Sequence, residues 1–201
     1  LYAKGSNICY DAEQEKAATG LRSLERGDNS QLLSEALQTA ARADVILAAL
    51  GECAEMSGES ASRTNPMIPD AQRDLLEALV ATGKPVVLLL FTGRPLILNW
   101  EDAHVHSILN VWFGGSETGD AVADVLFGKK SPCGKLTTTF SRSVGQLPLY
   151  YNHLNTGRPD SDAHVFNRYA SNYLDESNEP LYPFGYGLSY TTFTYSNMQL
   201  S

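Results

Sequence analysis

The stretch VILAAL (residues 45–50) decides the fold class of this chain. An uninterrupted apolar run of this length is typical of a strand covered on both faces, as in a parallel sheet. The run is followed by GECAEMSGESASR (residues 51–63), which carries three carboxylates and no ordinary turn chemistry. Ligands of open α/β sheets bind outside the carboxyl ends of the strands, so this acidic loop lies where a site is expected.

Two more strands are expected at VVLLLF (residues 86–91) and SILNVW (residues 107–112). Amphipathic helices are expected between and around them. Ser30 is the expected N-cap of the first helix, Pro69 starts the second, and residues 118–127 form the third.

Strand and helix that alternate in this way imply parallel pairing through right-handed crossovers. We therefore predict an α/β fold, a three-layer, flavodoxin-like sandwich around a mostly parallel sheet. The runs 45–50, 86–91 and 107–112 are its predicted neighbouring, buried strands, and the sandwich occupies residues 1–140.

The periodic pattern fades after residue 140. Residues 141–190 are rich in Tyr, Pro, Gly and Asn, and such a long connection is functional or packed against another surface. We expect an ordered, irregular extension that wraps over the sandwich and is anchored by Tyr182, Phe184 and Tyr186. Residues 191–201 read as a linker or strand that leads towards a further β domain.

Composition narrows the class of protein. A net charge of -8 among 201 residues argues against a nucleic-acid partner, and no apolar run is long enough to span a membrane. The start, LYAKG, is neither a signal peptide nor an initiator methionine, so we expect a piece of a longer protein. The three cysteines, Cys9, Cys53 and Cys133, have no metal-ligand spacing and leave the thiol state open.

The sequence lacks the motifs of dinucleotide sites, nucleotide sites and serine hydrolases. The chain has no GxGxxG, no Walker loop and no GxSxG elbow. His104 and His106 are expected to be surface residues before a strand. We therefore expect neither a cofactor nor a bound metal. A carboxylate in the loop after residue 50 could still serve as a general acid or a sugar ligand, or the loop could simply be solvated.

Aromatic residues follow the third expected strand. Trp112 and Phe113 are expected at the same sheet edge as the acidic loop. Aromatic faces beside carboxylates suit a sugar, because the rings pack on its C–H surface while the carboxylates accept its hydroxyls. The alternative is that both rings only cap the core.

Blocks along nearly the whole chain resemble the second domain of family-3 glycoside hydrolases, and among these the bacterial periplasmic β-glucosidases. The blocks that carry the resemblance are SGESASR (57–63), IPDAQR (68–73), GKPVV (83–87), GRPL (93–96), WFGG (112–115), VLFG (125–128), SPCGKL (131–136), QLPLYYN (146–152) and YPFGYGLSYT (182–191).

The resemblance implies a retaining β-glucosidase that acts on β-glucosides or short β-linked oligosaccharides. Its nucleophile would belong to an N-terminal (β/α)₈ barrel absent from this chain, and a fibronectin-like domain follows in many members. Carried over residue by residue, the resemblance puts the acid/base at Glu59, with Arg63 as its neighbour. With the aromatic residues argued above, the expected substrate-binding residues are Arg63, Ser57, Trp112 and Phe113. The family also implies a periplasmic location, and the chain alone is expected to be inactive.

One departure from the family pattern is Ser62, where many members have an aspartate. The pocket around Arg63, and hence the sugar preference, therefore stays open. A non-catalytic scaffold or sugar-binding domain of the same enzyme, or a family-3 β-xylosidase, is an alternative. An independent flavodoxin-like binding protein is a third possibility, which the acidic loop disfavours.

Overall fold

A parallel three-stranded sheet forms the centre of the molecule, in a computed structural model that describes residues 1–19, 25–159 and 167–200. The strands are β1 (Ile46–Gly51), β2 (Val86–Phe91) and β3 (Ser107–Asn110), in the order β1-β2-β3. Both pairs are parallel. The predicted α/β fold with three neighbouring parallel strands is confirmed.

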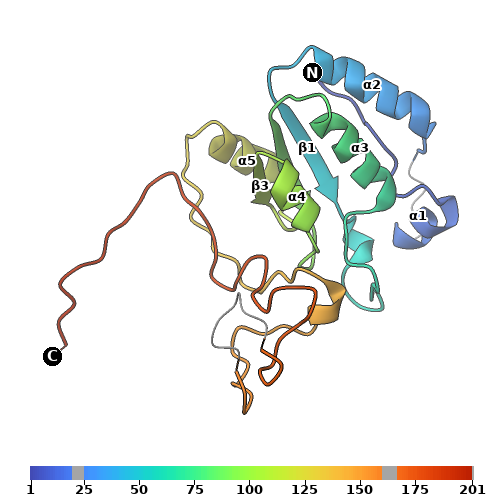
Figure 1. The fold of residues 1–201 in the computed structure, drawn as a ribbon. Helices are drawn as coiled ribbons and strands as arrows, with labels where there is room; N and C mark the ends of the chain where they lie inside the picture. The colour runs from blue at the N-terminus through green and yellow to red at the C-terminus, as the bar shows by residue number, and fades with distance from the viewer. Residues whose placement is uncertain (20–24, 160–166, 201) are drawn as a thin grey trace.

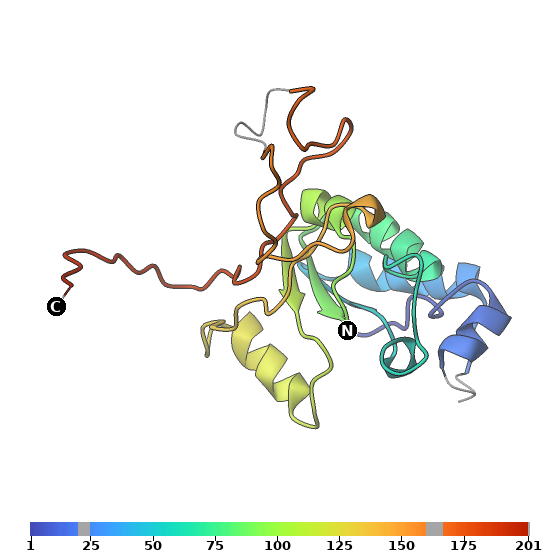
Figure 2. The ribbon, with the colours of Figure 1, turned by 90° about the horizontal axis from the view of Figure 1, so that it is seen from below.

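Helices surround the sheet (Figure 1). In the residues that the structure describes they are α1 (Ala12–Ala18), α2 (Asn29–Ala41), α3 (Asp70–Val80), α4 (Asn99–His104) and α5 (Thr118–Leu126), with short 3-10 turns η1 (Ala54–Met56) and η2 (Val144–Gln146). Helices α2 and α3 lie together on one side of the sheet, and α5 lies on the other (Figure 2). These are the predicted three layers.

Helix starts follow the capping chemistry of the sequence. The helix α3 begins directly after Pro69, as predicted. The N-cap of α2 is Asp28 rather than the predicted Ser30, because the Asp28 carboxylate accepts the Gln31 N–H at 2.9 Å. Either side chain can cap a helix, and the choice moves the boundary by two residues.

The prediction that the first strand is covered on both faces is wrong. Burial alternates along β1: Ile46 and Ala48 are buried, while Leu47 is 49% exposed. The reason is that β1 is an edge strand, and α3 packs on one of its faces. Only the central β2, where Leu88, Leu89 and Leu90 are all buried, behaves as its apolar run predicts.

The extension does not wrap over the sandwich in the expected way. It contacts the body near its two ends, where Phe140 is fully buried and forms an antiparallel bridge with Tyr182. Between them, Tyr150, Tyr151 and Tyr169 are exposed, and this part of the chain projects from the body (Figure 1). Within this part of the chain Tyr151 stacks on Phe184, so the extension packs on itself there rather than on the sandwich.

The three predicted anchors behave differently from one another. Tyr182 meets the ring of Phe140 edge-on at 6.0 Å and its hydroxyl donates to Asp102. Tyr186 stacks on Tyr182 at 5.1 Å, whereas Phe184 stacks on Tyr151 within the extension itself. Residues 191–200 form neither helix nor strand. Among the described residues, no helix has the length and apolar character needed to cross a membrane.

Gly51 generates the first prediction. Its φ is +134°, and a Cβ there would lie 1.9 Å from the carbonyl oxygen of Phe91. Gly51→Ala should therefore lower the free energy of unfolding by about 3 kcal/mol, measured by urea denaturation. The matched control is Gly119→Ala in α5, where a Cβ meets open space. That change should raise stability by up to about 1 kcal/mol. Equal effects of the two changes would contradict the close approach.

The cysteines generate a second prediction. All three thiols are free, and Cys133 is exposed. Burial, and then the carboxylates of Asp70 and Glu15, raise the pKa of Cys9 to about 11, and burial also raises the pKa of Cys53. A raised pKa leaves less thiolate at pH 8, and the thiolate is the reactive form.

One thiol should therefore react rapidly with Ellman's reagent in the native protein, and Cys133→Ser should remove that phase. Unfolding in guanidinium should make the other two react as well. A fast reaction of Cys9 in the folded chain would contradict the raised pKa.

Candidate functional site

The acidic loop leaves the sheet at the carboxyl end of β1, as predicted. The Gly51 N–H donates to Gln72 Oε1 at 2.7 Å, and Gln72 Nε2 donates back to the Gly51 carbonyl at 2.9 Å. The Glu52 N–H then donates to the Phe91 carbonyl at 2.7 Å. These bonds join the loop to α3 and to the end of β2, so its first residues have a fixed position.

Glu52 is the most deeply buried charge of the loop. Its side chain is 0% exposed and lies 2.7 Å from Arg63 Nη1 and 3.1 Å from Arg94 Nε. Its second oxygen accepts the hydroxyl of Thr92 at 2.8 Å and the N–H of Gly93 at 3.3 Å. A buried carboxylate needs such partners, because an unpaired charge is very costly out of water.

The two arginines also bind the backbone of the acidic loop and of the segment after it. Arg94 Nη2 donates to the carbonyls of Met56 and Ala61. Arg63 Nη2 donates to the carbonyl of Met67 at 3.0 Å. Arg63 therefore points inward to Glu52 here, and its expected contact with substrate stays a prediction.

Ser57 and Phe113 meet at the same edge of the sheet. An added Cβ on Gly93 would lie 2.2 Å from Ser57 Oγ and 2.8 Å from Phe113 Cε2, so both side chains sit against the backbone of Gly93. Phe113 is 42% exposed. The structure thus brings together two of the expected substrate-binding residues, from loops that follow β1 and β3.

Trp112 lies one residue away but faces the core. Its ring is 6.0 Å from that of the buried Phe140, which fits the alternative that this residue caps the core. Its φ is +57°, a left-handed conformation that is strained for a bulky residue. Trp112 is half-buried against the core, whereas Phe113 is exposed.

Glu59 lies on the turn of the acidic loop and is exposed. Its neighbours Gly58 and Ser60 have φ values of +114° and +58°. Among the three carboxylates of residues 51–63, Glu52 is buried and Glu55 half-buried, so Glu59 is the one that a partner or substrate can reach. Glu59 is thus accessible in this structure, and its catalytic role stays a prediction.

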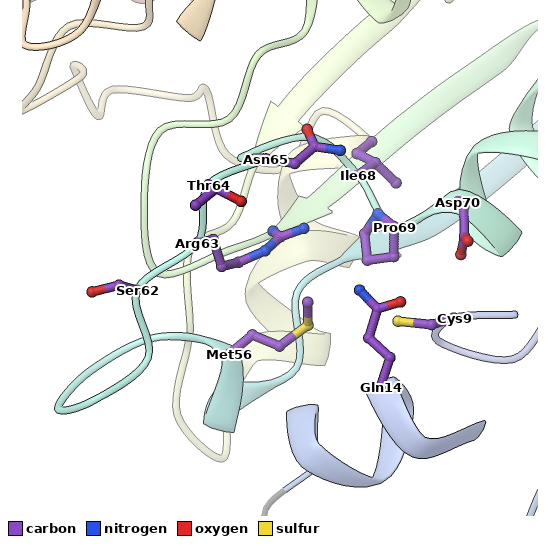
Figure 3. A pocket seen from close by; sticks show the side chains of 10 residues that line it. All are labelled: Cys9, Gln14, Met56, Ser62, Arg63, Thr64, Asn65, Ile68, Pro69 and Asp70. Carbon is purple, nitrogen blue, oxygen red and sulfur yellow. The ribbon is translucent and has the colours of Figure 1, made fainter. Parts of the chain in front are cut away.

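A polar pocket of about 310 Å³ adjoins this loop (Figure 3). Its lining comes from α1 and the segment before it, from the acidic loop and the segment after it, and from the start of α3. The lining residues are Cys9, Gln14, Met56, Ser62, Arg63, Thr64, Asn65, Ile68, Pro69 and Asp70. The departure from the family pattern at Ser62 therefore lies at the border of a cavity.

Sequence reasoning missed the partners of Glu52. Thr92 and Arg94 follow β2, and the sequence predicted no contact between them and the acidic loop. A usable signal was the position of Glu52 immediately after the glycine that ends a buried strand, where a charge needs a partner. His104 and His106 are exposed, as expected. In the described ranges, no group of three His, Cys, Asp or Glu residues is placed to hold a metal ion.

Known proteins with similar sequences are glycoside hydrolases. The chain is 52% identical to the periplasmic beta-glucosidase of Salmonella typhimurium over 208 aligned residues, which cover all of this chain and 26% of that protein. It is 40% identical to a beta-xylosidase of Formosa agariphila, with 83% of this chain and 22% of that protein covered. The chain thus spans about a quarter of the length of these curated relatives.

Solved structures agree in fold. The beta-glucosidase of Listeria innocua, in complex with isofagomine, superposes with a TM-score of 0.74 at 44% identity, covering 78% of this chain and 22% of that one. The model of the glycosyl hydrolase family 3 C-terminal domain matches residues 4–190. The chain therefore belongs to glycosyl hydrolase family 3, of which it forms a C-terminal domain.

Proposed function

We propose that this chain is the sandwich domain of a retaining β-glucosidase and that Glu59 is its acid/base. The observation that carries the proposal is the exposure of Glu59 on the loop after β1, beside the edge formed by Ser57, Gly93 and Phe113. The names of the Salmonella and Listeria relatives support β-glucosides as the substrate class. The name of the Salmonella relative also supports a periplasmic location.

Retaining hydrolysis uses two carboxyl groups about 5–5.5 Å apart. One attacks the anomeric carbon, and the other protonates the leaving oxygen and later activates water. We assign the second role to Glu59 and the nucleophile to an N-terminal barrel outside this chain. In this proposal Phe113 packs on the sugar or its leaving group, Ser57 hydrogen-bonds to it, and Arg63 holds the loop beside the substrate.

The acid/base role can be tested in a chimera, in which this chain replaces the aligned segment of the Salmonella enzyme. Glu59→Gln should lower kcat/KM for phenyl β-glucoside, a poor leaving group, by about 10²–10⁴-fold. It should change kcat/KM for 2,4-dinitrophenyl β-glucoside little, because that leaving group needs no protonation. Azide should raise kcat for 2,4-dinitrophenyl β-glucoside in this variant, because it attacks the glycosyl-enzyme without the base that Glu59 supplies to water.

The matched control is Glu55→Gln on the same loop, which should leave kcat/KM for both substrates unchanged. Unchanged kinetics of the Glu59→Gln chimera would contradict the acid/base role and support a scaffold role for this domain. The beta-xylosidase relative supports a second substrate class. The ratio of kcat/KM for aryl β-glucosides and aryl β-xylosides, measured in the unmodified chimera, decides between the two.

The isolated 201-residue chain should be folded and inactive. General acid catalysis alone contributes about 10²–10⁴-fold, far below the total acceleration of about 10⁶-fold or more that enzymes reach. The measurement is hydrolysis of an aryl β-glucoside by the purified chain. Turnover that Glu59→Gln abolishes would show that the chain carries its own nucleophile.

A further inference from the structure

The turn that carries Glu59 is closed by a single nitrogen of Arg94. Arg94 Nη2 donates to the carbonyl of Met56 and to that of Ala61, which lie on either side of residues 57–60. The two ends of the turn are therefore joined through one guanidinium. The position of Glu59 depends on where that guanidinium is held.

Glu52 holds the guanidinium. Its carboxylate lies 3.1 Å from Arg94 Nε, in an ion pair without hydrogen-bond geometry. It also pairs with Arg63, three residues after the turn. Its other oxygen binds Thr92 and Gly93, and Gly93 supports Ser57 and Phe113. One buried carboxylate thus connects the turn of Glu59 with the edge where a substrate would lie.

We infer that Glu52 is a positioning residue, which fixes the turn of Glu59 through Arg94 and Arg63. This inference rests on the proposed role of Glu59. Glu52 does not touch the substrate, because its side chain is 0% exposed beneath the loop. The carboxylate matters because glutamine at this position turns one of the two accepting oxygens into a donor. On one side that donor would face the guanidinium groups of Arg94 and Arg63. On the other side it would face the N–H of Gly93, and the Thr92 hydroxyl would have to accept instead of donate.

The chain offers a matched control for this cluster. Glu15 is also buried and pairs with Arg26 at 2.7 Å. Arg26 in turn donates to the carbonyls of Cys9 and Tyr10. This second cluster has the same chemistry, but it holds the N-terminal segment rather than the turn of Glu59.

The first measurement is hydrogen exchange in the 201-residue chain. The amides of Met56, Ser57 and Ala61 donate within the loop and are its reporters. Glu52→Gln should speed their exchange by about tenfold or more, while Glu15→Gln should leave it unchanged. Unchanged exchange in Glu52→Gln would overturn the inference, whatever the role of Glu59.

The second measurement uses the Salmonella chimera. Glu52→Gln should lower kcat/KM for phenyl β-glucoside by about 10–10²-fold, since a displacement near 1 Å has an effect of this size. The value for 2,4-dinitrophenyl β-glucoside should change far less, and Glu15→Gln should affect neither. If Glu52→Gln is folded and lowers kcat/KM for both substrates equally, the inference is overturned.

The two proposals fail in different ways. If Glu59→Gln shows no dependence on the leaving group while Glu52→Gln speeds exchange, the acid/base assignment is wrong and the mechanical role of Glu52 stands. If Glu59→Gln shows the dependence and Glu52→Gln does not, Glu52 is not a positioning residue. Should Glu52→Gln fail to fold, Arg94→Lys replaces it, because lysine keeps the charge but lacks the second nitrogen.

Discussion

The close approach of Gly51 to the backbone of Phe91 is the constraint on which the candidate site depends. A side chain at position 51 would overlap the Phe91 carbonyl, so only glycine lets β1 stay paired with β2 to this point. The next residue, Glu52, is then placed directly beside Thr92. The backbone contact thus places the Glu52 carboxylate, at the end of β1, beside the Thr92 hydroxyl at the end of β2.

The cluster around Glu52 fixes the geometry of the acidic loop more than it adds to the free energy of unfolding. Apolar side chains of similar volume often replace a buried ion pair with no loss of stability, because two charges lose their hydration on burial. An apolar residue at position 52 would leave Arg63 and Arg94 without their carboxylate. The ends of the loop would then lose the arrangement that Arg94 gives them. The charges are therefore best explained by the loop they hold.

The parts of the fold that depend on local pattern could be predicted from the sequence. The apolar run of β2 and the start of α3 at Pro69 belong to this group. The exposure of Leu47 could not be predicted, because it depends on which strands form the edges of the sheet and on what covers them. Likewise, Glu52 sets the direction of the Arg63 side chain. The order of charged residues along the loop does not predict that pairing. The course of the extension depends in the same way on distant partners, because Tyr182 packs on Phe140 whereas Tyr151 stacks on Phe184.

The candidate site combines an anchored loop with an exposed carboxylate. Ser60 and Trp112 both have left-handed backbone, which costs of order 1–3 kcal/mol for each such residue. Such conformations persist only where the surroundings determine them, and here Arg94 closes the turn beside Ser60 while Phe140 packs on the ring of Trp112. These two strained residues lie next to Glu59 and Phe113, whose side chains are exposed while the segments that carry them are anchored. In the proposed function Glu59 meets a second carboxyl group on another domain, and that role needs both properties: an anchored loop and an exposed side chain.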